Sequence, residues 1–259
     1  MNDIARGAGE RASSPHVVVA PSREAPRADA KFYLTMVLVS AAIIFAGFAP
    51  SFYLKSVIHA PPPLTLLTWT HGIVFTGWVV LFITQAWLIV AGKTAYHRQL
   101  GIAGAVLFGG MVALALSASI TAGRLGHAPP GAPPALAFMS LPLFAIAGAL
   151  ILFLTAMWNR QRSAWHKRLM LASFFIMTGP GTGRIAIPLG FAPQGSQIAL
   201  IVAELLLAAA MVYDWRRHGQ VHRAYWLAVA VFALTHIGVT WAFGGPALWM
   251  DFARAVTAT

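Results

Sequence analysis

Seven apolar stretches in the chain each approach or exceed the roughly 20 helical residues that cross a bilayer core. They lie at about 32–54, 64–91, 99–122, 135–158, 168–190, 196–214 and 224–243. Each stretch is continuous instead of alternating, which favours helices over a membrane barrel. Only 10% of the residues are charged and 58% are hydrophobic, whereas soluble domains carry about 25% charged residues. We therefore predict an all-α, polytopic transmembrane bundle of about seven helices.

The polar ends complete this organisation. Residues 1–31 are rich in Ala, Pro, Ser and Arg and are expected to form a disordered tail, with the transmembrane domain at 32–243. Residues 244–259 form a short outer segment, either an amphipathic segment on the interface or an exposed tail. The stretch 168–190 contains Gly179-Pro180-Gly181, which predicts a helix that is either kinked or partly unwound.

The basic residues set the orientation, since cytoplasmic loops carry an excess of Lys and Arg. With the N-terminus in the cytoplasm, the outer loops and tail hold only Lys55, Arg124 and Arg254. The basic clusters at 93–98, 160–168 and 216–223 then all lie inside. The net charge of +11 thus fits membrane orientation better than nucleic-acid binding. We expect a multi-pass protein of a bacterial inner membrane, in contact with lipid and with other membrane subunits if it belongs to a complex.

Ionisable side chains inside a bilayer are costly, so they are candidates for a functional site. Four lie on four different predicted helices: His71, Arg184, Glu204 and His236. At about 1.5 Å per residue, the histidines and Glu204 lie roughly 10 to 12 Å from the outer surface, with Arg184 nearby. We expect them to converge, with His71 and His236 able to hold a haem iron. Alternatively, each histidine bonds to a neighbouring group, and Arg184 and Glu204 neutralise each other.

Two further histidines lie at the predicted inner ends of the third and fifth helices. The order aromatic, His, basic, any residue, Leu occurs in Tyr96-His97-Arg98-Gln99-Leu100 and again in Trp165-His166-Lys167-Arg168-Leu169. This is a weak internal repeat. If both turn inward, His97 and His166 could ligate a second haem. Arginines such as Arg184 suit the anionic propionates of haem in general. The alternative is that both histidines anchor their helices at the headgroup level. Because the chain has no cysteine, thiolate sites and covalent c-type haem are excluded.

The preferred hypothesis is a membrane electron-transfer or oxidoreductase subunit that binds b-type haem. The competing classes are a transporter, in which Arg184, Glu204 and the histidines line a polar path, and a structural or assembly subunit. The chain has no Gly-rich phosphate loop, zinc-protease helix or hydrolase elbow.

Two resemblances rest on combinations of these motifs. The first combination consists of Thr70-His71-Gly72, Gly77-Trp78, Gln85, His97-Arg98-Gln99-Leu100-Gly101, His166-Lys167-Arg168-Leu169-Met170 and Arg184. Over about residues 30–215, it resembles an uncharacterised bacterial family of multi-pass membrane proteins, a domain of unknown function. That family usually has Trp at the position of Leu169. The sequences around His71-Gly72 and His97-Arg98 are also similar to ascorbate-reducible transmembrane cytochromes b. This second resemblance implies two haems held by four histidines on consecutive helices, but the stretch 135–158 contains no histidine.

Overall fold

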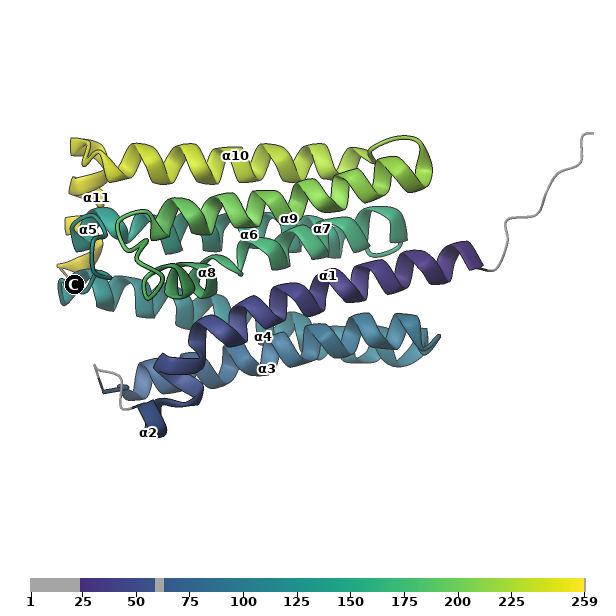
Figure 1. The fold of residues 1–259 in the computed structure, drawn as a ribbon, viewed down its shortest axis with the longest axis horizontal. Coiled ribbons are helices and arrows are strands. Elements are labelled where there is room, and N and C mark those ends of the chain that lie inside the picture. Colours follow the sequence, from purple (N-terminus) through teal and green to yellow (C-terminus); the bar gives the residue numbers. More distant parts are fainter. Residues whose placement is uncertain (1–23, 59–62, 259) are drawn as a thin grey trace, which may run out of the picture.

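The structure is a computed structural model that describes residues 24–58 and 63–258, in which all regular elements are helices. This confirms the all-α prediction. The long helices run roughly parallel to one axis and form one bundle (Figure 1). Within the described ranges, six helices are long and apolar enough to cross a membrane: Ala28–Tyr53, Leu66–Val90, Thr94–Arg124, Ala135–Trp158, Gly195–His218 and Arg223–Phe243. The chain is therefore a multi-pass membrane protein.

The first half of the bundle is built from α1 (Glu24–Phe48), α3 (Leu66–Val90) and α4 (Thr94–Arg124). A π-helical turn η1 (Ala49–Tyr53) and the short α2 (Lys55–Ile58) follow α1. Helix α1 begins eight residues before the predicted start at residue 32, so the expected disordered tail is wrong for residues 24–31. Residues 1–23, the rest of that predicted tail, lie outside the described part of the chain.

The predicted fifth span differs most from a single helix. It consists of α7 (Ser163–Ile176) and α8 (Gly179–Ala186), which are separated at Met177 and Thr178. Proline at the start of α8 lacks a backbone N–H and cannot continue the hydrogen bonds of α7. Neither piece is long enough to count as a span alone, which is why six and not seven spanning helices are found.

A close backbone contact positions α8 against α1. A Cβ atom added to Gly47 would lie 2.1 Å from the carbonyl oxygen of Gly181, and one added to Gly181 would lie 2.8 Å from the carbonyl oxygen of Ile43. Only glycine permits this approach, which brings Arg184, one turn beyond Gly181, beside the end of α1.

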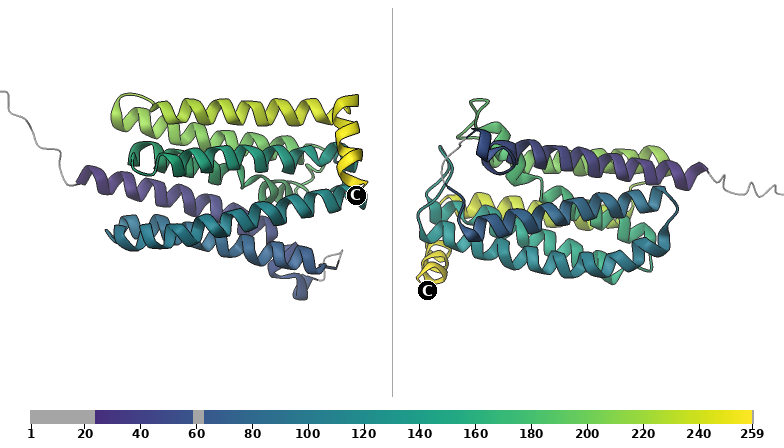
Figure 2. Two further views of the ribbon diagram at one scale, coloured as in Figure 1. Left: turned by 180° about the vertical axis from the view of Figure 1, so that it is seen from behind. Right: turned by 90° about the horizontal axis from the view of Figure 1, so that it is seen from below.

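The second half contains α5 (Ala135–Phe138), α6 (Ser140–Trp158), α9 (Gly195–His218) and α10 (Arg223–Phe243). Helix α11 (Ala247–Thr257) lies across the end of the bundle, opposite the start of α1 (Figures 1 and 2). It is anchored because the buried Trp249 donates its indole N–H to the carbonyl of Leu136 at 2.9 Å. The C-terminal segment is thus a packed helix and not an exposed tail.

Aromatic side chains fill the centre of the bundle. Phe82 stacks on Phe174 with ring centres 4.4 Å apart, and Phe108 stacks on Phe153 at 3.9 Å. Trp78 contacts both Phe108 and Phe174. These contacts join α3, α4, α6 and α7 into one core.

Candidate functional site

His97 and His166 lie together in the bundle, each in the first turn or so of its helix. Their ring centres are 6.3 Å apart and their ring planes are inclined by 82°. The Nδ1 atom of His97 lies 3.3 Å from the carbonyl oxygen of Gln85, and that of His166 lies 2.9 Å from the carbonyl oxygen of Ala156. A carbonyl can only accept, so each Nδ1 carries the proton and each Nε2 is the nitrogen with a lone pair.

The two halves of this pair are built in the same way. In the hairpin of α3 and α4, a carbonyl near the end of α3 holds the histidine near the start of α4. In the hairpin of α6 and α7, a carbonyl near the end of α6 holds the histidine near the start of α7. The short sequence repeat at these positions therefore corresponds to a repeated structural role.

The surroundings of His97 include an unsatisfied amide. Both the nitrogen and the oxygen of the Gln85 side chain are buried, and neither has a hydrogen-bond partner among the described residues. This amide faces Gly101, one turn after His97, where an added Cβ would lie 3.8 Å from Gln85 Nε2. Buried polar groups are nearly always paired, so an unpaired amide one turn from His97 marks a place suited to a polar ligand group.

The basic residues beside the two histidines divide into two kinds. Lys167 pairs with Asp29 at 2.7 Å and the buried Arg168 pairs with Asp214. Arg98 is exposed and makes no ion pair within the described part of the chain. Of the basic residues immediately after the histidines, Arg98 is therefore the one available for an anionic group.

The four ionisable residues of the outer half do not form one cluster, and this corrects the prediction made from their common depth. His236 Nδ1 lies 2.6 Å from Glu204 Oε1, joining α9 to α10. Arg184 instead donates to the carbonyl of Pro180 at 3.0 Å, and its guanidinium lies 4.2 Å from the centre of the Phe48 ring. Arg184 and Glu204 are thus not a neutralising pair.

His71 belongs with Arg184 and not with His236. Its ring centre is 5.8 Å from that of Phe75, and Arg184 is near enough to act on it electrostatically. No hydrogen bond, ion pair or ring contact joins His71 to His236 in the described ranges, so the expected second pair of haem ligands is not assembled. Sequence position gave all four residues similar depths, but not the direction each takes around its helix axis.

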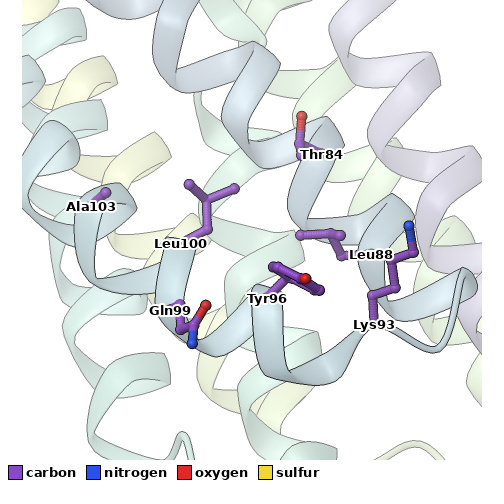
Figure 3. Close-up of a pocket in the computed structure, with 7 residues that line it drawn as sticks. All are labelled: Thr84, Leu88, Lys93, Tyr96, Gln99, Leu100 and Ala103. Atoms are coloured by element: carbon purple, nitrogen blue, oxygen red, sulfur yellow. The ribbon is translucent and has the colours of Figure 1, made fainter.

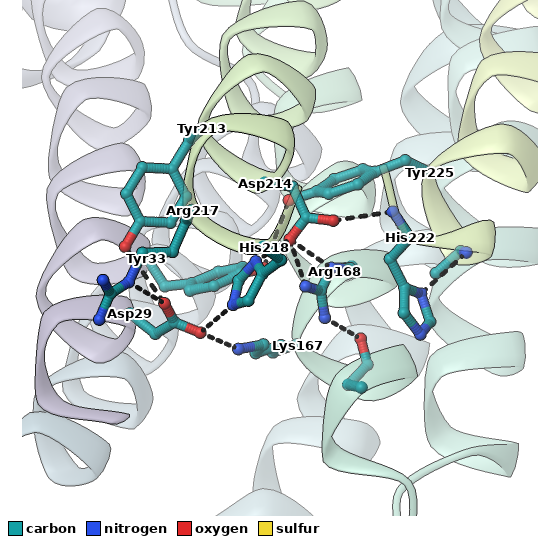
Figure 4. Close-up of polar contacts among 12 residues, drawn as sticks. Asp29, Tyr33, Lys167, Arg168, Tyr213, Asp214, Arg217, His218, His222 and Tyr225 are labelled. Atoms are coloured by element: carbon teal, nitrogen blue, oxygen red, sulfur yellow. Dashed lines mark hydrogen bonds and ion pairs between the residues drawn. The ribbon is translucent and has the colours of Figure 1, made fainter. Parts of the chain in front are cut away.

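The structure also contains a polar network that sequence reasoning missed (Figure 4). Asp214 accepts hydrogen bonds from Arg168 and from the backbone N–H of His222, the latter at 2.8 Å. His218 lies between the two acids, 3.1 Å from Asp214 and 3.4 Å from Asp29. The network joins α1, α7, α9 and α10 at the end of the bundle that holds His97 and His166. Its members are far apart in sequence, and the excess of basic residues that marks the inner surface was the only available signal.

Two grooves open on the surface of the bundle. One, of about 540 Å³, lies along α3 and α4 and includes none of the predicted site residues. It is lined by Thr84, Leu88, Lys93, Tyr96, Gln99, Leu100 and Ala103 (Figure 3). The other, of about 410 Å³, lies between α9 and α10 and contains Glu204 and His236. In the described residues, no group of three or more His, Asp or Glu side chains is placed to hold a metal ion.

Comparisons with protein-family models, curated proteins and solved structures found no match.

Proposed function

We propose that this protein is a membrane electron-transfer protein in which a b-type haem would be held between α4 and α7 by His97 and His166. The observation that carries the proposal is the distance between the two rings. An imidazole nitrogen lies about 1.2 Å from its ring centre and a metal–nitrogen bond is about 2.0 Å long, so two coaxial imidazole ligands have centres about 6.4 Å apart. The rings of His97 and His166 are 6.3 Å apart.

The hydrogen bonds to Nδ1 support the same role. Histidines that bind a metal commonly donate their other ring N–H to a carbonyl or carboxylate, which fixes the tautomer and the ring orientation. Both rings do so here, with Gln85 and Ala156 as acceptors. The chain has no cysteine, so the haem would be held without covalent thioether bonds.

The residues around the pair have separate tasks in this proposal. A bound haem supplies a one-electron carrier whose potential depends on its axial ligands and on burial. His97 and His166 would hold the iron, Arg98 would be available to a propionate, and the Gln85 amide could donate to a polar group of the ligand. The aromatic core around Phe82 and Phe174 limits the access of water from the outer half of the bilayer. With the N-terminus in the cytoplasm, this site lies on the cytoplasmic side of a bacterial inner membrane.

The experiment is spectroscopy of the protein purified from cells supplied with haem. We expect a Soret band that disappears in His97→Ala and in His166→Ala and persists in His71→Ala and in His236→Ala. The nearly perpendicular ring planes further predict a low-spin ferric electron paramagnetic resonance signal dominated by one large g value. A protein that stays colourless after haem reconstitution, or loses its haem when His71 or His236 is replaced, would refute the proposal.

A second candidate function is transport, and a specific group of residues favours it. The predicted fifth span is broken at Met177 and Thr178, and Arg184 lies in the last turn of the short α8 that follows the break. Irregular backbone at membrane depth is tolerated where it lines a cavity. His71 Nδ1 on α3 and Ser51 Oγ in η1 are buried without hydrogen-bond partners in the described residues. This alternative predicts a colourless protein whose uptake of an anionic solute in liposomes fails in Arg184→Gln. If the protein shows neither haem binding nor transport, the third class of function, a structural role in a larger complex, is favoured.

A further inference from the structure

Glu204 and His236 form a polar pair on a surface that faces lipid. Their side chains are 38% and 33% exposed, although Glu204 lies nine residues inside α9 and His236 lies seven residues from the end of α10. Ionisable groups at this depth normally face the bundle interior or a polar partner. Here Glu204 and His236 are each other's polar partner, but their exposure in an open groove leaves Nε2 of His236 available to a ligand that enters from the bilayer.

The groove has a polar end and an apolar length. Its lining follows one face of each helix: Glu204, Leu207 and Met211 on α9, and Val229, Phe232 and His236 on α10. These residues span seven positions on each helix, which corresponds to about 10 Å. The carboxylate and imidazole lie at the outer end, and the apolar residues continue from them toward the other side of the membrane. The groove therefore suits an elongated apolar molecule with one compact polar head.

The pair can offer that head either a donor or an acceptor. When Glu204 is ionised, His236 Nδ1 carries the proton of the 2.6 Å hydrogen bond, and Nε2 can accept from a hydroxyl. When the pair holds one more proton, Glu204 can donate to Nδ1, and Nε2–H can then donate to a carbonyl. The two states differ by a single proton and present opposite hydrogen-bonding character. In the described part of the chain, the hydrogen bond of His236 is made by Nδ1, and Nε2 has no hydrogen-bond partner.

We infer that this groove binds the head group of a lipid-soluble quinone or quinol. A quinone presents a carbonyl to Nε2–H, a quinol presents a hydroxyl to the Nε2 lone pair, and the isoprenoid chain continues along Leu207, Met211 and Phe232. A volume of about 410 Å³ suits one substituted ring and the start of its chain. A fatty acid would place a carboxylate against Glu204, and a phospholipid headgroup lies too close to the surface. The inference concerns binding and protonation, and it does not depend on the haem pair at the opposite end of the bundle.

The experiment measures binding of decylubiquinone to the purified protein in lipid nanodiscs by equilibrium dialysis. We expect saturable binding at one site, weakened at least tenfold in His236→Leu and in Ala233→Trp, whose new side chain fills the groove. Ala209→Trp is the matched control, because Ala209 is an exposed residue of α9 that does not line the groove, and it should bind like the unchanged protein. Glu204→Gln keeps an amide oxygen that can accept from His236 Nδ1 and should retain quinone binding.

Several results would overturn the inference. They are binding that does not saturate, equal binding in His236→Leu, and equal binding of decanol, which shares the apolar chain but lacks the carbonyls. A fourth is a dimer that dissociates in Ala233→Trp but not in Ala209→Trp, because the groove would then be an interface between two copies. Since the measurement needs no haem, a protein without a Soret band can still pass this test, and a haem protein can fail it.

Discussion

The buried ion pair between Arg168 and Asp214 allows a stability prediction whose size follows from burial. The two residues are 4% and 1% exposed, so Asp214→Asn leaves a guanidinium in the bundle with no opposing carboxylate. Breaking a buried pair by removing one partner costs about 3–5 kcal/mol. At about 2–4 °C per kcal/mol for a domain of this size, the midpoint of thermal unfolding should fall by roughly 6–20 °C. Tryptophan fluorescence of the detergent-purified protein follows this transition.

The control is the same change at an exposed pair. Asp251 lies 3.1 Å from Arg254 on α11, and the two side chains are 72% and 63% exposed, so Asp251→Asn should cost no more than about 1 kcal/mol. Adding Arg168→Met to Asp214→Asn removes the unpaired charge and should recover most of the lost stability. If Asp214→Asn lowers the midpoint no more than Asp251→Asn does, the network is not a buried structural element and the reasoning is wrong.

Two further predictions concern the backbone and the pH. Gly47→Ala places a Cβ 2.1 Å from the Gly181 carbonyl oxygen and should lower the free energy of unfolding by about 1–3 kcal/mol or more. The control Gly109→Ala, with nothing within 4 Å of its Cβ, should leave the midpoint of thermal unfolding unchanged or slightly higher. Equal effects of the two substitutions would contradict the close crossing of α1 and α8. Burial, reinforced by the charge of Arg168, lowers the pKa of His222, whose neutral Nδ1 caps α10. The unfolded chain then binds this proton more readily than the folded one, so stability should fall as the pH drops through about 6.5, and less steeply in His222→Asn, which retains a capping side chain. An identical slope in the variant would show that His222 is not responsible.

The spanning helices could be predicted because lipid requires a continuous apolar run, and such runs are visible in the sequence. The ends of the helices were harder to predict from the sequence. Helix α1 begins at Glu24 in a polar segment, and contacts across the bundle hold its first turns: Asp29 binds Lys167 and Tyr213. The break after α7 was indicated by Gly179-Pro180-Gly181, but only the structure shows two separate helices. For the start of α1 the missing information is a contact between residues more than a hundred positions apart.

The outer residues show why depth alone does not define a site. Counting residues from a helix end gives the height of His71, Glu204 and His236, since each residue advances about 1.5 Å. It does not give the direction of the side chain around the helix axis, which differs by about 100° between neighbours. In soluble proteins the apolar stripe supplies that direction, but these helices are apolar on every face. His236 consequently faces a groove between α9 and α10 while His71 faces α8 and the end of α1.

The inner pair was predictable for a reason that the outer residues lack. His97 and His166 each follow a short hairpin connection, so a nearby carbonyl of the preceding helix, at Gln85 or Ala156, fixes the ring locally. Two hairpins with the same local arrangement then need only dock against each other, and the stacked rings of Phe108 and Phe153 join α4 to α6. A site made from two similar halves leaves a trace in sequence as a repeat, here aromatic-His-basic-any-Leu. Glu204 and His236 lie on two unlike helices and leave no such repeat, so their pairing becomes visible only when the helices are packed.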